Sequence, residues 1–300
     1  MGTPDYATSI FTELIGQSDK YKITSLITQS DKKVGRKQIL TPPHIKQYCL
    51  DNNLDIPIYQ PAKLSAQENI DIIKEQRPDF IIVAAYGQIL SQEILDLAPC
   101  INLHASILPE FRGASPIQQA ILKDKARVGV TAMLMDRGLD TGDILGFSVI
   151  DNEDYNAPDL FVALTKIAST LLLDTLDRYE NIMPLKQTNA LSSYARKVSK
   201  QDGLVEFLNA REVYLKYQAY FYWPHISLAS GLKLVRIELV NTKKEHKKAG
   251  SLLEITKEYS LIACAQGELK IYEVQPSSKN KMPLYEYLQG KRMVIGDILL

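Results

Sequence analysis

The sequence is poor in cysteine and histidine. Its 300 residues include three cysteines and four histidines. An odd number of cysteines without any Cys-x-x-Cys spacing argues against a disulfide framework and against a zinc finger. The histidines, at positions 44, 104, 225 and 246, lack the spacing of metal ligands. We therefore expect no metal site and a reducing, cytoplasmic environment.

The sequence also lacks long apolar runs and an excess of charge. No stretch approaches the roughly 18 apolar residues that a membrane helix needs, and the start lacks the basic and apolar pattern of a secretory signal. Thirty-five basic residues balance 35 acidic ones. Their distribution is uneven, because residues 1–185 carry a net charge of −7 and residues 186–300 one of +7. The asymmetry favours two domains with different partners, although surface charge also drifts between domains without a functional reason.

Short apolar runs alternate with helical patterns in the first 185 residues. We predict strands at 21–29, 78–87, 100–105, 128–136 and 144–150, and helices at 65–76, 115–124 and 157–179. This alternation is typical of an α/β fold with a Rossmann-like, mostly parallel sheet covered by helices. Ligands bind such sheets beyond the carboxyl ends of the strands.

The pattern changes after residue 185. Residues 186–203 are polar and basic, as in a linker. A helical pattern at 209–220 then precedes short strands separated by hairpin-type turns, which predicts a small β-barrel. We therefore expect an α/β domain at 1–185, a basic linker at 186–203 and a C-terminal β-barrel domain at 204–300.

Polar residues alternate with apolar ones at the start of "NLHASILPEFRGASPIQQAI" (102–121). On an extended strand, Asn102, His104 and Ser106 would share one face. Buried polar groups must be paired or used. His104 alone is equally well explained as a buried side chain bonded to the backbone, but Asn102 on the same face favours a functional site. Ser106 lacks the Gly-x-Ser-x-Gly context of a hydrolase nucleophile.

Two loops carry further candidates. In "DRGLDTGDIL" (136–145), hydrogen-bonded turns explain Asp136 and Asp143, whereas Asp140 could orient an imidazole. The loop "SDKKVGRKQILTPP" (30–43) carries four basic residues. Such runs are usually solvated surface, but this one follows a strand on the side where ligands bind, so phosphate or nucleic-acid contact is a second reading.

These motifs resemble those of the formyltetrahydrofolate-dependent formyltransferases. The segment from Asn102 to Ile121 is similar to the family's signature, in which an Asn, a His and a downstream Asp are catalytic. "GVTAMLMDRGLDTGDIL" (129–145) resembles the second half of that signature. "GTPDYA" (2–7), "IVAAYGQIL" (82–90) and "YWPHI" (222–226) extend the resemblance over nearly the whole chain. They are most similar to the branch that acts on methionyl initiator tRNA.

The resemblance implies transfer of a formyl group from the co-substrate 10-formyltetrahydrofolate to the α-amino group of methionyl initiator tRNA, for translation initiation. Asn102, His104 and Asp140 would be the catalytic residues. Asn102 and His104 can donate hydrogen bonds to the oxyanion that forms on the formyl group. Asp140 can hold the tautomer of His104, or help to remove the proton of the attacking amine. The donors are built in, so the chemistry requires no metal.

The resemblance also implies binding residues and a monomeric protein. The folate would lie near Ser106, Ile107, Leu108 and Pro109, with the pterin edge at the backbone around Ala85, Tyr86 and Gly87. The acceptor stem of the tRNA would contact Lys32, Lys33, Arg36 and Lys37, and the basic rear half would bind tRNA backbone.

Two alternatives remain open. A related enzyme could formylate a purine precursor or an amino sugar, although purine-pathway relatives lack the C-terminal barrel and the basic loop. An RNA-binding module could have kept the fold and lost the chemistry, but the presence of Asn102, His104 and Asp140 argues against it.

The first residues suggest a gap in the sheet. "MGTPDYATSIFTELI" opens with the turn and helix that in this family follow an apolar first strand, which is central in a doubly wound sheet. We therefore expect strand-forming residues upstream of Met1, and a poorly soluble or inactive protein without them.

Overall fold

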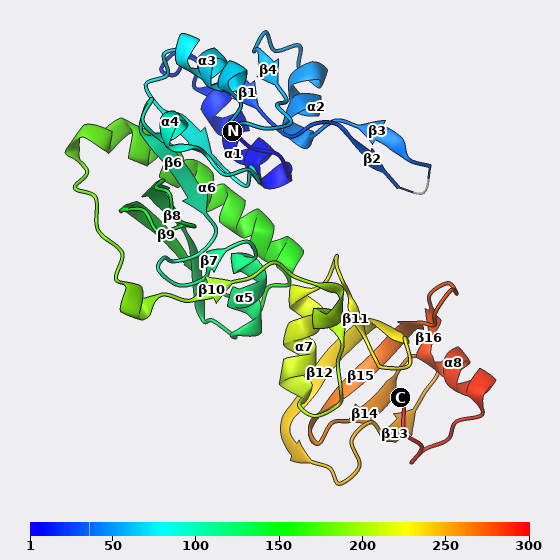
Figure 1. Cartoon of the computed structure of the whole chain (residues 1–300). Coiled ribbons are helices and arrows are strands. Elements are labelled where there is room, and N and C mark those ends of the chain that lie inside the picture. Colours follow the sequence, from blue (N-terminus) through cyan, green and yellow to red (C-terminus); the bar gives the residue numbers. More distant parts are fainter. Residues whose placement is uncertain (36) are drawn as a thin grey trace. The chain divides into compact units, whose positions relative to one another are not determined.

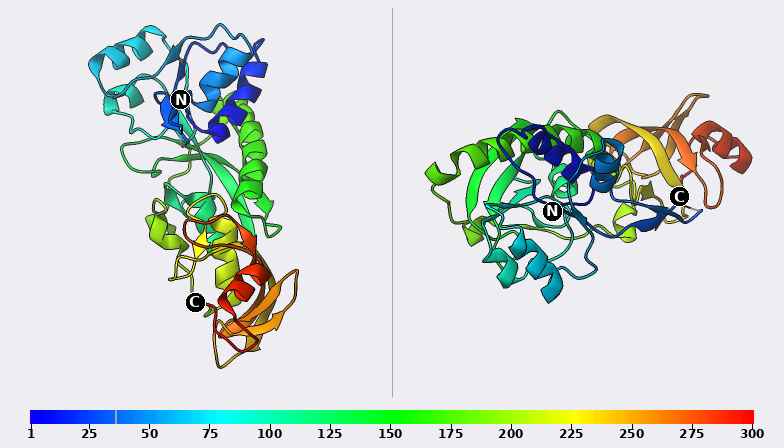
Figure 2. Two further views of the ribbon diagram at one scale, coloured as in Figure 1. Left: turned by 90° about the vertical axis from the view of Figure 1, so that its right-hand side faces the viewer. Right: turned by 90° about the horizontal axis from the view of Figure 1, so that it is seen from above.

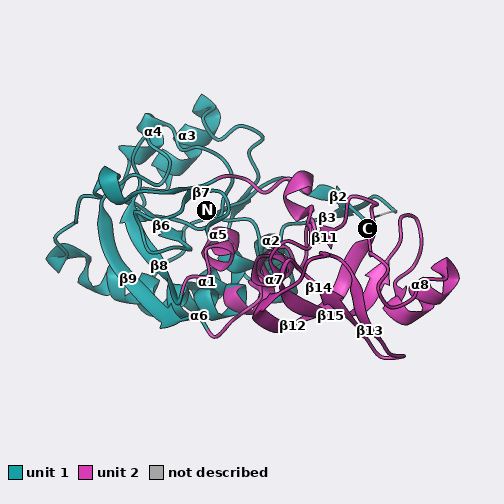
Figure 3. Cartoon of the chain, turned by 90° about the horizontal axis from the view of Figure 1, so that it is seen from below, with its two compact units in different colours: residues 1–116, 126–152, 161–195 teal, residues 117–125, 153–160, 196–300 magenta. Residues whose placement is uncertain are grey.

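The computed structural model describes residues 1–35 and 37–300, which form two compact units (Figure 3). Unit 1 comprises residues 1–116, 126–152 and 161–195. Unit 2 comprises residues 117–125, 153–160 and 196–300. In the described part of the chain, no helix combines the length and apolar character needed to cross a membrane.

The main sheet of unit 1 has the strand order β5-β6-β8-β9 in the described residues (Figure 1). Its strands are β5 (Ile81–Val83), β6 (Cys100–His104), β8 (Arg127–Leu134) and β9 (Ile144–Asp151). β5 and β6 are parallel, whereas β6–β8 and β8–β9 are antiparallel. The sheet is therefore mixed, and the prediction of a mostly parallel sheet was wrong. The short loop between β8 and β9 accounts for that antiparallel pair, because parallel neighbours need a long crossover connection. β6 and β8 are antiparallel although α5 (Pro116–Leu122) lies between them in the sequence.

Smaller strands and the helices make up the rest of the chain up to Asn181. β1 (Leu26–Ile27) pairs in parallel with β4 (Ile58–Tyr59), and β2 (Lys32–Val34) forms an antiparallel hairpin with β3 (Ile39–Thr41). β7 (Arg112–Gly113) pairs in parallel with β10 (Tyr194–Ala195). The helices from Met1 to Asn181 are α1 (Asp5–Gly16), α2 (His44–Asp51), α3 (Gln67–Glu75), α4 (Gln92–Leu95), α5 (Pro116–Leu122), α6 (Ala157–Arg178) and η1 (Tyr179–Asn181).

The core of unit 1 lies between the helices and the sheet. Every residue of β6 is buried, as expected for a strand covered on both faces. On α6, Leu164, Ala168 and Leu172 recur at helical spacing and are at most 1% exposed. Leu171 packs over Gly146 of β9, and Figure 2 shows α6 running along the sheet.

Met1 and Gly2 lie between β1 and β5. The Gly2 N–H donates to the carbonyl oxygen of Ile27 at 3.1 Å, and the Ala84 N–H donates to that of Met1 at 3.0 Å. The Met1 amino group donates to the carbonyl oxygen of Ile82. These two residues therefore bridge the ends of the two strands through main-chain hydrogen bonds.

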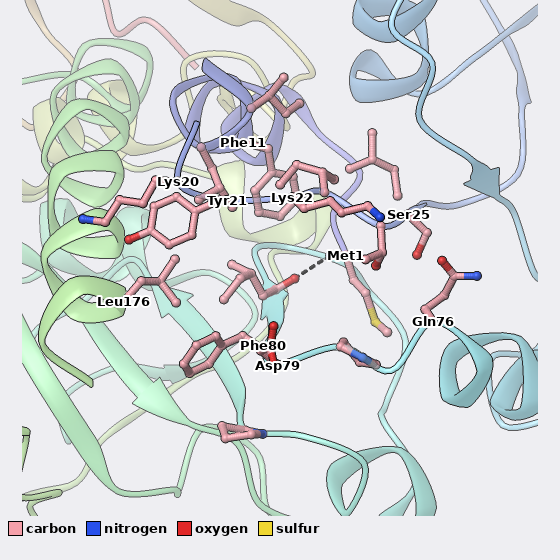
Figure 4. Close-up of a pocket in the computed structure, with 18 of the residues that line it drawn as sticks. Met1, Phe11, Lys20, Tyr21, Lys22, Ser25, Gln76, Asp79, Phe80 and Leu176 are labelled. Carbon is pink, nitrogen blue, oxygen red and sulfur yellow. Dashed lines mark hydrogen bonds between the residues drawn. The ribbon is translucent and has the colours of Figure 1, made fainter. Parts of the chain in front are cut away.

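Beyond the Met1 amino group, a cavity of about 880 Å³ lies beside β1 and β5 (Figure 4). Phe11 of α1, Leu176 of α6 and Phe80 line it together with polar residues of the segment 20–25.

Unit 2 is built on an antiparallel sheet of order β11-β12-β15-β14-β13, with β16 against β15. Its strands are β11 (Ile226–Ser227), β12 (Lys233–Glu245), β13 (Leu252–Ile255), β14 (Ser260–Ala263), β15 (Gln266–Gln275) and β16 (Met282–Pro283). The remaining helices of the chain are η2 (Asn189–Leu191), η3 (Lys200–Gly203), α7 (Ala210–Ala219) and α8 (Leu284–Lys291).

The sheet of unit 2 is not a closed barrel in the described residues, so the prediction of antiparallel strands was correct and that of a barrel was wrong. Its edges are covered by other segments of the unit instead of pairing with each other. Leu204 bridges to Ser227 of β11, and Ile298 bridges to Ser251 just before β13. Such cover protects open edges without closure.

Candidate active site

Asn102 and His104 lie at the carboxyl end of β6, where they are 9% and 6% exposed. β6 ends at His104. Ser106 therefore lies beyond the strand, and the prediction that it shares a strand face with Asn102 and His104 was wrong. The Ser106 N–H instead donates to the His104 carbonyl oxygen at 2.9 Å, and the Ser106 hydroxyl donates to the Glu110 carbonyl oxygen at 2.6 Å. Ser106 therefore shapes the turn that follows the strand.

Asp140 lies in the loop between β8 and β9, and its carboxylate faces both Asn102 and His104. The Asn102 Nδ2 donates to Asp140 Oδ1 at 3.3 Å. Asp140 Oδ2 accepts from the Gly113 N–H at 2.9 Å and lies 3.6 Å from His104 Nδ1. The structure thus brings an amide, an imidazole and a carboxylate from distant parts of the sequence into one buried cluster.

The two nitrogens of the His104 ring face different oxygens. Nε2 lies 2.9 Å from the carbonyl oxygen of Phe111. Because a carbonyl oxygen only accepts, Nε2 carries a proton and Nδ1 faces the Asp140 carboxylate. A developing oxyanion would compete well for the Nε2 proton, since hydrogen bonds to charged acceptors are stronger than those to neutral carbonyls.

The loop that carries Asp140 is tightly folded. Asp136 Oδ1 accepts from the Gly138 N–H at 2.9 Å and from the Thr141 hydroxyl at 2.7 Å, which confirms the turn expected for Asp136. A Cβ at Gly142 would lie 1.8 Å from the Leu134 carbonyl oxygen. Asp140 has a φ of +54°, which is uncommon for a residue with a side chain.

Comparison with known proteins identifies the family. The formyl transferase family matches residues 1–156, and the C-terminal domain of formyl transferases matches residues 197–292. The methionyl-tRNA formyltransferase of a Nitratiruptor species is 50% identical over 299 residues, 99% of this chain and 97% of its own length. That of Campylobacter jejuni (strain RM1221) is 48% identical over 100% of this chain and 98% of its own. The chain belongs to the methionyl-tRNA formyltransferase family.

Solved structures with low sequence identity share the fold. The sugar 3N-formyl transferase WlaRD aligns with a TM-score of 0.66 and 20% identity, covering 93% of this chain and 97% of its own. A methionyl-tRNA formyltransferase from Clostridium thermocellum aligns with a TM-score of 0.52 and 20% identity, covering 65% of this chain and 87% of its own.

The loop after β5 holds three residues predicted to contact folate in the formyltransferase family. Because β5 and β6 are parallel, with Val83 opposite Asn102, this loop follows the same edge of the sheet as the cluster. Ala85 and Gly87 are exposed and have positive φ angles. Tyr86 is buried, and burial raises the pKa of its phenol to about 12.

The segment 106–109, also predicted to contact folate, is anchored on β8. The Thr131 hydroxyl donates to the Ser106 carbonyl oxygen at 2.6 Å and accepts from the Leu108 N–H at 3.0 Å. Ser106 and Leu108 are buried, whereas Ile107 and Pro109 are partly exposed. Side chains from this segment therefore remain accessible next to His104.

The basic loop is a hairpin that projects from unit 1 (Figure 1). Lys32 and Lys33 on β2 and Lys37 in the turn are exposed. Arg36, the fourth residue predicted to contact tRNA, lies outside the described residues.

The base of the hairpin is bonded to the loop after β5. Lys46 and Gln60 hydrogen-bond Asp31 at its base and lower the pKa of that carboxyl. Gln60 also donates to the carbonyl oxygen of Gln29, and the Gln29 side chain donates to that of Tyr86 at 3.1 Å. Hairpin and loop are thus linked by a continuous chain of hydrogen bonds.

Three groups around the cluster were missed by sequence reasoning: the Gly113 N–H, the Phe111 carbonyl and the Gln187 side chain. The first two are backbone groups, which carry no residue signature. Gln187 lies in the segment expected to be a linker, yet it belongs to unit 1. Among residues 1–35 and 37–300, no group of three or more His, Cys, Asp or Glu side chains is arranged to hold a metal.

Proposed function

We propose that this chain transfers the formyl group of 10-formyltetrahydrofolate to the α-amino group of methionyl initiator tRNA. Near 50% identity to methionyl-tRNA formyltransferases over the whole chain supports the activity. The observation that carries the site assignment is the buried convergence of Asn102, His104 and Asp140. The three groups supply the donors and the acceptor that formyl transfer needs.

The reaction begins with attack of the amine nitrogen on the formyl carbon. The carbonyl electron pair moves to oxygen, where the Asn102 amide and the His104 ring stabilise the charge. The proton of the amine passes to N10, directly or through water, as collapse of the intermediate breaks the bond between the formyl carbon and N10. This leaves tetrahydrofolate and the formamide.

Asp140 acts mainly by orienting its neighbours. Both of its oxygens already accept hydrogen bonds, one from Asn102 and one from the Gly113 N–H. The same carboxylate faces His104 Nδ1 and helps to fix the orientation of the ring, so that Nε2 can donate to the oxyanion.

The binding residues are assigned by their position. Ser106 to Pro109 and Ala85 to Gly87 border the cluster from two loops at one sheet edge, where ligands of α/β sheets bind, and we assign the folate to them. Lys32, Lys33, Arg36 and Lys37 are assigned to the phosphates of the acceptor stem. The enzyme acts as a monomer in the cytoplasm, where initiator tRNA is charged.

A comparison of acceptors tests the activity. Purified protein with 10-formyltetrahydrofolate should formylate methionyl initiator tRNA, and should leave uncharged initiator tRNA and nucleotide-linked amino sugars unmodified. The sugars are a demanding control, because WlaRD shares the fold. Preferred formylation of an amino sugar would overturn the proposal, as would equal rates on initiator and elongator methionyl-tRNA.

The hairpin assignment has its own test. Replacing Lys32 and Lys33 by Ala should raise the KM for tRNA and flatten its salt dependence, because fewer phosphates are neutralised. The KM for the formyl donor should stay unchanged. Lys166→Ala, which removes an exposed lysine of α6, is the matched control. Unchanged tRNA kinetics in the Lys32/Lys33 variant would show that the hairpin does not contribute to tRNA binding.

A further inference from the structure

The segment 187–195 runs beside residues 112–114, which follow β6 in the sequence. The Arg112 N–H donates to the Ser193 carbonyl oxygen at 2.9 Å, and the Ala114 N–H donates to that of Ala195 at 2.8 Å. Gly113 makes this approach possible. A Cβ at Gly113 would lie 2.7 Å from the Ala195 carbonyl oxygen, and its φ is +112°.

Gln187 connects this segment to the Asp140 loop. Its Nε2 donates to the carbonyl oxygen of Asp140 at 3.0 Å and to that of Gly142 at 2.8 Å. Its Oε1 accepts from the Nε of Arg112 at 2.9 Å. One amide group therefore bonds the backbone on both sides of Thr141.

Arg112 fixes the orientation of that amide. A guanidinium only donates, so the Gln187 oxygen must face Arg112 and the two amide protons must face the loop carbonyls. Arg112 is itself 9% exposed and is held by Nη1, which donates to Asn189 Oδ1 at 3.1 Å. A flipped amide would set its one oxygen against the two carbonyl oxygens and its NH2 against the Arg112 Nε–H, and all three hydrogen bonds would be lost.

Asp140 needs this support because of its backbone. A left-handed conformation at a residue with a Cβ costs about 1 kcal/mol or more, and it persists only where the surroundings enforce it. The turn around Asp136 holds the start of the loop, but Gln187 is the side chain that bonds the carbonyl of Asp140 itself. Relaxation of this residue would move its carboxylate away from Asn102 and His104.

We propose that Gln187, oriented by Arg112, is a positioning residue that holds Asp140 in its working geometry. The proposal rests on the proposed catalytic role of Asp140. The same segment also supports His104, because the Ser193 hydroxyl accepts from the Phe111 N–H at 2.8 Å and the Phe111 carbonyl oxygen accepts from His104.

Two variants at position 187 test the proposal. Gln187→Met keeps the length of the side chain and removes its hydrogen bonds, and Gln187→Glu keeps the acceptor for Arg112 and removes the donors. Both should lower kcat by roughly 10- to 100-fold, because small displacements of a catalytic group cost that much. The KM values for donor and tRNA should change less than about twofold. Gln201→Met, at an exposed glutamine, should match the wild type.

A double-mutant cycle separates positioning from general support of the fold. In an Asp140→Asn background, Gln187→Glu should have almost no further effect on kcat, because it acts through Asp140. Effects that multiply in the double variant would overturn the positioning role and leave the catalytic assignment intact. A wild-type rate for Asp140→Asn alone would overturn the catalytic assignment, and with it the role of Gln187.

Discussion

The two edges of β5 differ in the partners of their main-chain hydrogen-bonding groups. On one edge, β6 pairs with β5 along the strand. Asn102 and His104 of β6 belong to the cluster, where they form hydrogen bonds to Asp140 and to the Phe111 carbonyl oxygen. On the other edge, Met1 and Gly2 bond the end of the strand, and the rest faces a cavity (Figure 4). The first edge is therefore paired along the strand, and the second is bonded at its end by Met1 and Gly2.

The difference predicts that activity and stability depend on different edges. The cluster is fixed by segments distant in the sequence, including the loop with Asp140 and the segment 187–195. The cavity edge is lined by Met1 and by side chains of α1 and α6. Changes at the cavity should therefore alter the free energy of unfolding, and changes at the cluster should alter the rate.

The largest effect should come from filling the cavity. Fusing about five strand-forming apolar residues to Met1 supplies a strand partner and apolar side chains for the cavity. The free energy of unfolding, measured by chemical denaturation, should rise by about 4 kcal/mol or more, because each buried apolar side chain contributes about 1.5–3 kcal/mol. A Gly/Ser extension of equal length adds no apolar side chains, so it should stabilise less. Equal gains from both extensions would show that the cavity accepts no strand.

At the cluster, Asn102→Ala and His104→Ala should each lower turnover by roughly 100-fold or more, which corresponds to about 2.7 kcal/mol of barrier. Affinity for tRNA should be nearly intact, because neither side chain belongs to the hairpin. Formylation assays and tRNA binding measure the two quantities. Turnover like that of the wild type in either variant would remove that residue from the mechanism.

The smallest of these effects should come from Gly113→Ala. The added Cβ meets Ala195 and Tyr194 in a backbone conformation that favours glycine, so unfolding should require about 1–3 kcal/mol less. Gly16→Ala at the end of α1 is the matched control, because a Cβ there meets no atom within 4 Å. Equal stabilities of the two variants would mean that the segment 187–195 lies farther from β7.

The sequence predicts the helices and strands whose own residues show a clear hydrophobic periodicity or apolar run. The long helix at 157–179 and the strands at 128–136 and 144–150 are found within two residues of their expected bounds. The strands expected at 21–29 and 78–87 are reduced to Leu26–Ile27 and Ile81–Val83. Both lie beside the cavity, and they pair with β4 and β6 on their other edges.

The sequence motifs contain Asn102, His104 and Asp140, which the structure brings together, but they do not reveal the groups that support these side chains. Ser106 leaves the shared face because β6 ends at His104 and a turn begins. Gln187 could not be found, since a glutamine in a polar segment shows no periodicity and its partners lie more than 40 residues away in the sequence.

Single-turnover formylation of methionyl initiator tRNA by Asp140→Asn tests the central assignment most directly. With donor and tRNA both saturating, the rate isolates the chemical step from binding. The cluster geometry predicts a rate at least about 100-fold below that of the wild type, with unchanged affinity for the formyl donor. A rate equal to that of the wild type would contradict the role of this cluster in formyl transfer.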